Sequence, residues 1–302
     1  MQKMSELLTK NEKLEHELKK SYLAAKKNEA FCNLVNELNA SDELLMQYTS
    51  RLEDSAIEYN NCLNCKGLIN CLNKIEGHAC LPIVKDGYIE FKYRPCRYKK
   101  KYDKENSFLE NIYTIDMSDS IKTARMKDIY TADKTRYEVI KYLKEFIDNP
   151  LKGKGLYLHG NFGCGKTYLI TAAFNEVAKK NIKSAIIFWP EFLKHLKTLF
   201  NNGYTFEETI NKVSKAPILL IDDIGAENMT SWGRDEILCS ILQYRMDQNL
   251  KTFFTSNLTI EELEIHLSVT KDEADIVKAK RIIERIKHLT NDIEMISKNL
   301  RK

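Results

Sequence analysis

The spacing of hydrophobic residues changes character near residue 150. From residue 155 onward, short apolar runs alternate with stretches that have the periodicity of a helix. Alternation of this kind is typical of parallel strands joined by crossover helices. The sequence therefore predicts an α/β domain over residues 151–302, with strands at 155–159, 184–189, 216–222, 251–256 and 292–297.

The first 60 residues are polar, and their apolar positions recur near the 3.6-residue period of a helix. We expect about three helices here, one of them starting at Ser41, where acidic residues follow a capping serine. The first helix could present a coiled-coil or partner-binding face, although an ordinary solvated helix of a small bundle explains the same pattern. The basic run at 97–106 indicates a linker or solvated extension.

These patterns predict three parts along the chain. An N-terminal domain is expected over 1–105, a linker and mostly helical lead-in over 106–150, and the α/β domain over 151–302.

The composition is that of a mildly basic protein without membrane-spanning segments. The 302 residues are 43% hydrophobic and carry a formal net charge of +4, which permits contact with nucleic acid without arguing for it. No apolar run approaches the roughly 20 residues of a membrane span, and the first 20 residues lack the apolar centre of a secretory signal. We therefore expect a cytoplasmic protein with reduced thiols and no membrane partner.

The stretch "LYLHGNFGCGKTYLI" at 156–170 places three glycines directly after an apolar run. Its centre matches G-x-x-x-x-G-K-[ST], the phosphate loop of nucleotide-binding proteins, in which backbone N–H groups surround an anion. A helix-forming run follows and adds the partial positive charge of its N-terminus. The sequence thus predicts ATP and Mg²⁺ binding, with Lys166 on the phosphates, Thr167 on Mg²⁺, and a nucleotide-binding set of Gly160, Asn161, Phe162, Gly163, Cys164, Gly165, Lys166, Thr167 and Tyr168.

Polar residues follow two of the expected strands where ligands bind in open α/β sheets. Asp222 and Asp223 directly follow the four apolar residues at 218–221. Asn257 is the last residue of "TFFTSN". We expect Asp222 to hold Mg²⁺, Asp223 to orient or polarise the attacking water, and Asn257 to sense the γ-phosphate. A turn with a helix cap would also explain the two acids, and Asn257 could simply form a turn before a helix capped by Thr259.

Two arginines lie four residues apart in "KAKRIIERIKHL", on one face of an expected helix. Arg281 and Arg285 could serve as an arginine finger at a subunit boundary, a group that contributes about 10³–10⁵ in rate where it operates. A solvated arginine-rich helix face is the ordinary explanation of the same pattern.

The ordered set "GNFGCGKT", "ILLIDDIGAE", "FFTSN" and "RIIERI" resembles the AAA+ ATPases. The stretches "PEFLKHLK", "IDDIGAENMTSWGRDEI" and "KAKRIIERI" are more closely similar to bacterial helicase loaders of the DnaI/DnaC type, and the similarity covers most of the chain. The resemblance implies an α/β, AAA+ P-loop fold: a five-stranded parallel sheet in the order 5-1-4-3-2, helices on both faces, no C-terminal lid, and a small helical zinc-binding domain in front.

The same resemblance implies a function. The chain would be an ATP-dependent loader of a DnaB-type hexameric replicative helicase onto single-stranded DNA during primosome assembly, a slow ATPase that self-associates. ATP would lie between subunits, with Arg285 reaching a neighbour's γ-phosphate as the finger and Arg301 acting as a second sensor. Two alternatives stay open: a transposition-type AAA+ regulator, which would lack a zinc-bearing docking domain, and a nucleotide-binding adapter without significant hydrolysis.

Five of the eight cysteines lie between residues 62 and 96, and Cys62 and Cys65 form a C-x-x-C pair. Such a pair can hold one edge of a tetrahedral Zn²⁺ site. Unrelated buried thiols or a redox pair would also explain it. The resemblance implies a zinc-bearing, helicase-docking domain and supports Cys62, Cys65, His78 and Cys96 as ligands, with Cys71 as the substitute for His78 and no counterpart for Cys80.

Contacts to single-stranded DNA are also implied by the resemblance. Lys194, His195 and Lys197 follow the second expected strand and could contact phosphates in a salt-dependent way. For each of them a solvated helix face, with Phe192, Leu193, Leu196 and Phe200 in the core, is the simpler interpretation. The sequence gives no support for specific base reading.

Overall fold

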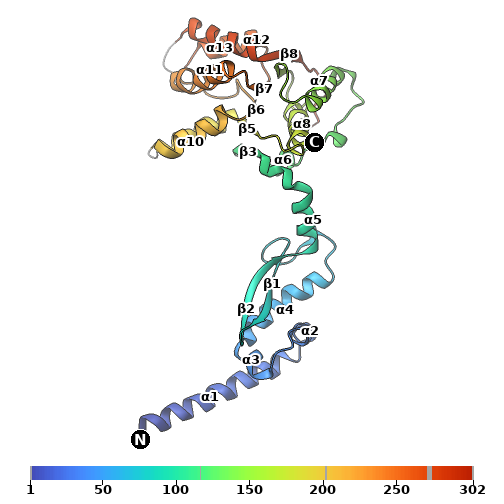
Figure 1. Cartoon of the computed structure of the whole chain (residues 1–302), viewed down its shortest axis with the longest axis vertical. Helices are drawn as coiled ribbons and strands as arrows, with labels where there is room; N and C mark the ends of the chain where they lie inside the picture. The colour runs from blue at the N-terminus through green and yellow to red at the C-terminus, as the bar shows by residue number, and fades with distance from the viewer. Residues whose placement is uncertain (1, 116, 201–202, 271–273, 301–302) are drawn as a thin grey trace. The chain divides into compact units, whose positions relative to one another are not determined.

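The computed structural model describes residues 2–115, 117–200, 203–270 and 274–300. The chain divides into two compact units, Met1–Asn106 and Ser107–Lys302, each with a hydrophobic core of its own (Figure 1). Residues 107–150, which were expected to form a linker and lead-in, belong to the second unit. No helix in the described ranges is both long enough and apolar enough to cross a membrane.

The first unit begins with four helices, where the sequence analysis expected about three. Ser41 caps the third as predicted, because its hydroxyl accepts a hydrogen bond from the Leu44 N–H at 3.3 Å. Tyr22, Phe31, Leu34 and Leu52 are buried in the core between the helices. The helices are α1 (Gln2–Ala25), α2 (Glu29–Glu37), α3 (Asp42–Gln47) and α4 (Thr49–Leu63), and the single turn η1 (Leu68–Asn70) follows.

The first unit also contains a β-hairpin, which the expectation of a small helical domain did not include. Strands β1 (His78–Lys85) and β2 (Tyr88–Pro95) pair antiparallel around Asp86 and Gly87, whose φ angles are both positive. Asp-Gly is the residue pair that two-residue hairpin turns favour, so the sequence did contain this signal. The basic run expected to be a linker forms helix α5 (Arg97–Asn106).

The second unit contains a parallel sheet of six strands in the order β3-β5-β6-β7-β4-β8. The five expected strands stand in the order that the family resemblance implied. A sixth, β3 (Ile112–Ile115), pairs with β5 at the edge and was missed because four residues carry too little pattern. The others are β4 (Gly155–His159), β5 (Ser184–Phe188), β6 (Ile218–Asp222), β7 (Lys251–Ser256) and β8 (Thr290–Glu294).

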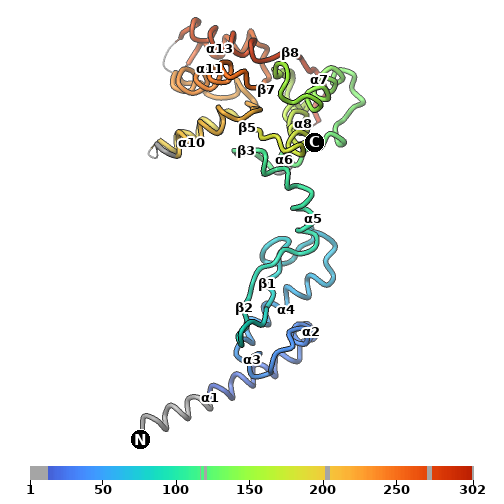
Figure 2. Tube along the Cα trace, in the orientation of Figure 1, coloured from blue at the N-terminus to red at the C-terminus, as the bar shows by residue number. Residues whose placement is uncertain are grey.

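Helices cover both faces of this sheet, as the trace in Figure 2 shows for α7 and α8 on one side and α11 and α13 on the other. Thr259 and Glu262 form a reciprocal capping box at the start of α12, which confirms the predicted cap. The helices are α6 (Asp119–Lys122), α7 (Tyr137–Asp148), α8 (Lys166–Ala178), α9 (Trp189–Thr198), α10 (Gly203–Ser214), α11 (Cys239–Asp247), α12 (Ile260–Ser268) and α13 (Ile276–Leu289), with short turns η2 (Ser107–Asn111), η3 (Met126–Asp128), η4 (Lys134–Arg136) and the π-helical η5 (Trp232–Leu238).

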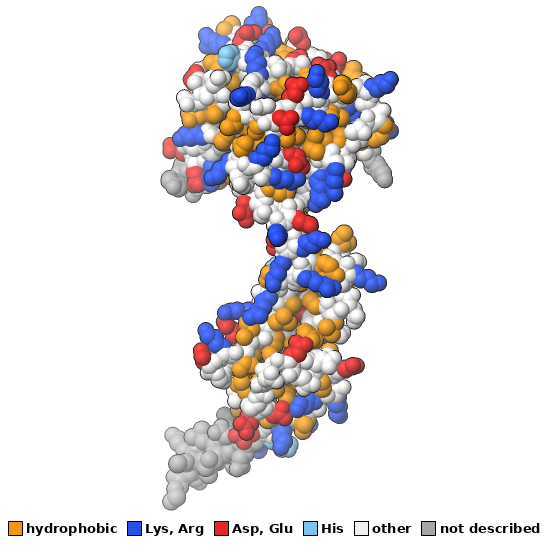
Figure 3. Space-filling view, turned by 45° about the vertical axis from the view of Figure 1, so that its right-hand side comes forward, with side chains coloured by type: hydrophobic (Ala, Val, Ile, Leu, Met, Phe, Trp, Pro, Cys, Tyr) orange, Lys and Arg blue, Asp and Glu red, His pale blue; other side chains and the backbone are white. Residues whose placement is uncertain are grey.

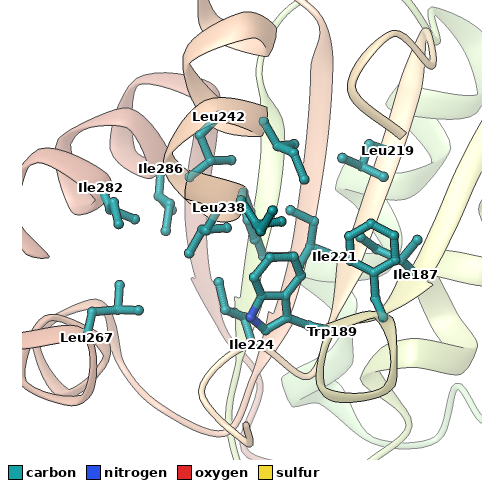
Figure 4. Packing of buried hydrophobic residues seen from close by; sticks show 14 of the residues in the cluster. Ile187, Trp189, Leu219, Ile221, Ile224, Leu238, Leu242, Leu267, Ile282 and Ile286 are labelled. Atoms are coloured by element: carbon teal, nitrogen blue, oxygen red, sulfur yellow. The ribbon is translucent and has the colours of Figure 1, made fainter. Parts of the chain in front are cut away.

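Alternate strand residues enter two separate cores. Leu219 and Ile221 of β6 pack with Trp189 and the residues of α11 to α13 on one face (Figure 4). Leu220, between them, packs with α7 and α8 on the other face. Because both faces are buried, the strands read as continuous apolar runs, and their polar carboxyl ends all reach the same edge of the sheet.

Candidate nucleotide-binding site

The phosphate-loop sequence connects β4 to α8. Gly160 has a φ of 140°, and a Cβ atom there would lie 2.1 Å from the Met295 carbonyl oxygen, so the loop passes too close to the chain after β8 for any side chain. Gly165, with a φ of 88°, directly precedes α8. The N–H groups at the start of α8 have no carbonyl partners within the helix, so this loop can bind an anion.

The Lys166 ammonium is held inside the loop. Its Nζ donates hydrogen bonds to the carbonyl oxygens of Gly160 at 2.8 Å and Asn161 at 3.0 Å, and to Asn257 Oδ1 at 2.8 Å. The side chain is buried. A phosphate group entering the loop would therefore meet a positive charge that is already positioned and that can exchange neutral acceptors for an anion.

Thr167 and Asp222 meet across the site as the prediction of a shared magnesium ion requires. The Thr167 hydroxyl donates to Asp222 Oδ1 at 2.7 Å, and the Thr255 hydroxyl donates to the same oxygen at 2.6 Å. Burial raises the pKa of Asp222 to about 6, although both hydrogen bonds and Lys166 oppose that rise. A hydroxyl and a carboxylate oxygen side by side are ligands that Mg²⁺ prefers.

Asn257 connects the loop lysine to the second acid. Its Nδ2 donates to Asp223 Oδ1 at 3.0 Å, while its Oδ1 accepts from Lys166. Asp223 has a φ of 56°, in the left-handed region that aspartate tolerates better than most residues, and its N–H donates to the Thr255 hydroxyl. The turn after β6 thereby directs the carboxylate toward Asn257, which in turn contacts Lys166.

A cavity of about 760 Å³ joins these groups, a size that suits a nucleotide. It extends from the acidic end of β6 along the loop to the segment before α7 and to Leu300. The predicted residues that line it are Phe162, Gly163, Gly165, Lys166, Thr167, Tyr168, Asp222, Asp223 and Asn257.

Three predicted loop residues support the cavity without lining it. Gly160 provides the close approach to Met295. Asn161 donates to the Ser297 carbonyl at 2.8 Å and accepts from the Ser297 N–H at 3.1 Å, which ties the loop to the chain after β8. Cys164 is fully buried beneath the loop. Their roles are therefore structural in this arrangement.

One wall of the cavity consists of residues that were not predicted from the sequence. Ile129, Tyr130 and Arg136 come from the segment before α7, and Leu300 comes from the chain after β8, where its N–H donates to the Gly163 carbonyl at 2.9 Å. No periodic or motif signal marks these residues, because the tertiary fold alone brings 117–136 and 295–300 to the loop. Arg136 is almost completely buried.

The predicted finger does not enter the cavity of its own chain. Arg285 lies on α13, donates through Nε and Nη2 to Gln243 Oε1 at 2.9 and 2.7 Å, and through Nη1 to Cys239 Sγ at 2.9 Å. It lines a separate basic hollow that also includes Arg281. Arg301 lies outside the described residues.

The candidate zinc ligands line one pocket of about 280 Å³ in the first unit: Cys62, Cys65, Cys71, His78 and Cys96. Cys80 does not line it. Within the described residues, however, no group of three or more His, Cys, Asp or Glu side chains is arranged to hold a metal ion. The five expected ligands therefore share one pocket, while a group of side chains arranged for metal binding is not found among the described residues.

The candidate DNA-contacting residues lie on α9. Phe192, Leu193 and Leu196 are buried as the core alternative predicted, whereas Phe200 is 55% exposed and does not belong to that core. Lys194 forms an ion pair with Glu191 at 2.6 Å. On the face drawn in Figure 3, side chains of both charges intermingle over the second unit, which argues against a single dominant basic surface there.

Comparison with known proteins agrees with this geometry. Residues 129–302 match a family model described as IstB-like ATP binding protein. The chain is 35% identical over 273 residues to the replicative helicase loader DnaI of Bacillus subtilis (strain 168), covering 88% of this chain and 86% of that protein. It is 27% identical over 124 residues to the replicative helicase loader DnaC of Escherichia coli (strain K12), covering 41% and 49%.

Solved structures show the same relationship. A crystal structure of DnaI superposes with a TM-score of 0.56 at 40% identity, covering 64% of this chain and 99% of that one. A primosome component of Streptococcus pyogenes serotype M3, described as putative in its structure's name, gives a TM-score of 0.56 at 30% identity and covers 66% and 100%. The chain therefore belongs to the DnaI/DnaC-type replicative helicase loaders, ATP-binding proteins of the AAA+ superfamily.

Proposed function

We propose that this chain hydrolyses ATP and uses the state of the bound nucleotide to control the loading of a replicative DNA helicase onto single-stranded DNA. The observation that carries the proposal is the 2.7 Å contact of Thr167 with Asp222 in the cavity that also contains Lys166. That contact joins the two proposed magnesium ligands in the same cavity as the proposed phosphate-binding lysine. Family membership supports the loader role.

Each polar residue of the cavity has a separate role in the proposed hydrolysis of ATP. Lys166 exchanges its contacts to the loop carbonyls and Asn257 for the β- and γ-phosphates. Thr167 and Asp222 hold Mg²⁺, which neutralises charge on the phosphate oxygens when bound. Asp223 orients the attacking water, and Asn257, hydrogen-bonded to both Lys166 and Asp223, responds to the γ-phosphate.

Assembly completes the site in this proposal. Arg285 contacts Gln243 and Cys239 within its own chain and lies outside its own nucleotide cavity, so it can act as a finger only on a neighbouring subunit. The first unit would dock on the helicase hexamer while the second unit self-associates and contacts single-stranded DNA. Contact with single-stranded DNA through Lys194, His195 and Lys197 would weaken as salt rises.

We also propose that the first unit holds Zn²⁺ through Cys62, Cys65 and Cys96, with Cys71 or His78 as the fourth ligand. All five side chains line one pocket. N–H groups of Asn73, Gly77 and Lys99 donate to the sulfur atoms of Cys62, Cys71 and Cys96 at 3.3, 3.3 and 3.5 Å, which is the kind of contact that stabilises thiolate ligands. His78 Nδ1 lies 3.0 Å from the Glu76 carbonyl, which leaves Nε2 for a metal.

Two other functions compete with this one. A transposition-type regulator shares the ATPase unit, because the IstB-like model covers residues 129–302. The loader is favoured because the match to DnaI is longer than the whole second unit and so extends into the first. An adapter without hydrolysis is disfavoured by the assembled set of Lys166, Thr167, Asp222 and Asp223.

A loading assay tests the proposal directly. Purified chain, the replicative helicase of the same organism and circular single-stranded DNA covered with single-strand-binding protein are combined, and unwinding of an annealed oligonucleotide is measured. We expect ATP-dependent unwinding with the wild-type chain and at most a tenth of it with Lys166→Ala. Equal unwinding by the two proteins would overturn the ATP-dependent loader.

A further inference from the structure

Arg136 is a buried cation, and two of its three guanidinium nitrogens lack an acceptor among the described residues. It ends the turn η4 before α7, and only 1% of its surface is exposed. Within the described part of the chain, its Nε and Nη1 atoms have no hydrogen-bond partner. Arginine stays protonated in proteins even though burial lowers its pKa here, so the positive charge is present although Nε and Nη1 lack hydrogen-bond acceptors.

A second buried arginine in the same unit shows what a structural role looks like. Arg245 is fully buried, and its Nε, Nη1 and Nη2 donate to the Thr252 hydroxyl at 2.8 Å, the Ala216 carbonyl at 2.7 Å and the Lys251 carbonyl at 2.7 Å. That guanidinium joins three segments of chain. The Nε and Nη1 donors of Arg136 have no such acceptors among the described residues, although buried donors are almost always paired.

The carboxylate of Asp133, whose charge acts on Arg136, accepts hydrogen bonds from other donors. Asp133 accepts from the Ser297 hydroxyl at 2.6 Å and from the N–H and hydroxyl of Thr135 at 3.0 and 2.8 Å. These hydrogen bonds, with a smaller contribution from Arg136, lower the pKa of Asp133 to about 2. Asp133 is therefore an anion that already accepts hydrogen bonds from Ser297 and Thr135.

The guanidinium faces the nucleotide cavity. Arg136 lines the cavity together with Gly163, Gly165 and Leu300, and its Nη2 lies 3.2 Å from the position that a Cβ on Gly165 would occupy. It therefore stands at the start of α8, the helix N-terminus that favours binding of a phosphate. The end of β6 contributes Asp223, which is linked through Asn257 to the side chain of Lys166.

We propose that Arg136 is a nucleotide-binding residue that donates hydrogen bonds to the phosphates shared by ATP and ADP, and that it does not read the γ-phosphate. This inference rests on the proposed nucleotide function. A planar guanidinium suits phosphate oxygens well, and the phosphates would supply the acceptors that the folded chain lacks. Arg136 thus raises affinity for both nucleotides equally, while Asn257 distinguishes one from the other.

Calorimetric titration of the full-length chain with Mg·ADP and with a non-hydrolysable Mg·ATP analogue tests this. Arg136→Met is compared with wild type and with Arg245→Met as the matched buried-arginine control, and Tm is measured without nucleotide. We expect Arg136→Met to weaken both ligands about 10- to 100-fold, the range of a hydrogen bond from a charged donor. Arg136→Lys, which keeps the charge without the fork, should lose less.

The Tm separates a binding role from a structural one. Removing an unsatisfied buried cation should leave the Tm of the nucleotide-free chain unchanged or higher, whereas Arg245→Met should lower it by several degrees. Unchanged affinity in Arg136→Met, a loss confined to the ATP analogue, or a fall in Tm like that of Arg245→Met would each overturn the inference. If wild type binds neither nucleotide, the proposed function itself fails.

Discussion

The hydroxyl of Thr167 and the carboxylate of Asp222 share a hydrogen bond of 2.7 Å although 55 residues separate them in the chain. The contact places the first residues of α8 against the end of β6. Both oxygen atoms of this contact belong to side chains that would hold Mg²⁺ in the proposed site. Asp222 would have to be ionised to do so, which would couple metal binding to the protonation of a buried acid.

Stability should respond to Asp222 with a definite sign. Its pKa is raised from 3.8 to about 6 in the folded chain, so between these values the folded state binds more protons than the unfolded state. The free energy of unfolding therefore falls as pH rises through this window. Asp222→Asn, which cannot ionise, should exceed wild type by roughly 2–3 kcal/mol at pH 7 and by nothing near pH 3.5, measured by denaturant unfolding without nucleotide. The exposed Asp148→Asn serves as control, and a less stable Asp222→Asn at pH 7 would contradict the assignment.

Asn257→Ala should affect ATP more than ADP. The substitution removes the amide that joins Lys166 to Asp223, while the loop carbonyls still hold the lysine. We expect kcat for ATP hydrolysis to fall about 10- to 100-fold, the cost of one positioned polar group in a transition state, with ADP affinity within threefold of wild type. Steady-state kinetics and ADP titration measure both quantities, and the exposed Asn211→Ala should change neither. Parallel losses for ADP and ATP would show that Asn257 does not sense the γ-phosphate.

Arg285 should act between subunits. Arg285→Ala leaves its own nucleotide site intact, and Lys166→Ala leaves its own arginine intact, so each variant should be nearly inactive alone as an ATPase. Mixed in equal amounts they should recover a measurable part of wild-type turnover, because some neighbouring pairs combine an intact site with an intact finger. Arg281→Ala, on the same hollow, is the control and should stay active by itself. Absence of recovery in mixtures that demonstrably co-assemble would exclude the finger role.

Removal of zinc should unfold the first unit selectively. The pocket residues connect the end of α4, the loop to β1 and the start of α5, which have few buried apolar side chains of their own. Cys62→Ser and Cys96→Ser should lose bound zinc and lower the Tm of the first transition, because structural zinc supplies folding free energy. Cys80→Ser should retain the metal, since Cys80 lies off the pocket. Zinc measured by elemental analysis in purified protein, together with calorimetric scans, decides this, and comparison of Cys71→Ser with His78→Ala identifies the fourth ligand.

Local sequence determined a large part of this protein. The phosphate loop, the buried strand ending at Asp222 and the caps at Ser41 and Thr259 each depend on neighbouring residues, so motif and periodicity predicted them correctly. The family resemblance further supplied the order of the five main strands. The hairpin turn at Asp86 and Gly87 also has a local signal, the Asp-Gly pair.

Tertiary structure alone decided the rest. Strand β3 is only four residues long and becomes a strand because β5 offers an unpaired edge. Arg136 joins the nucleotide cavity because the chain before α7 packs beside the loop. Arg245 becomes structural because acceptors before β6 and at the start of β7 surround its guanidinium. The same residue type thus acquires opposite roles, since the availability of acceptors around a buried charge depends on segments that are far apart in the chain.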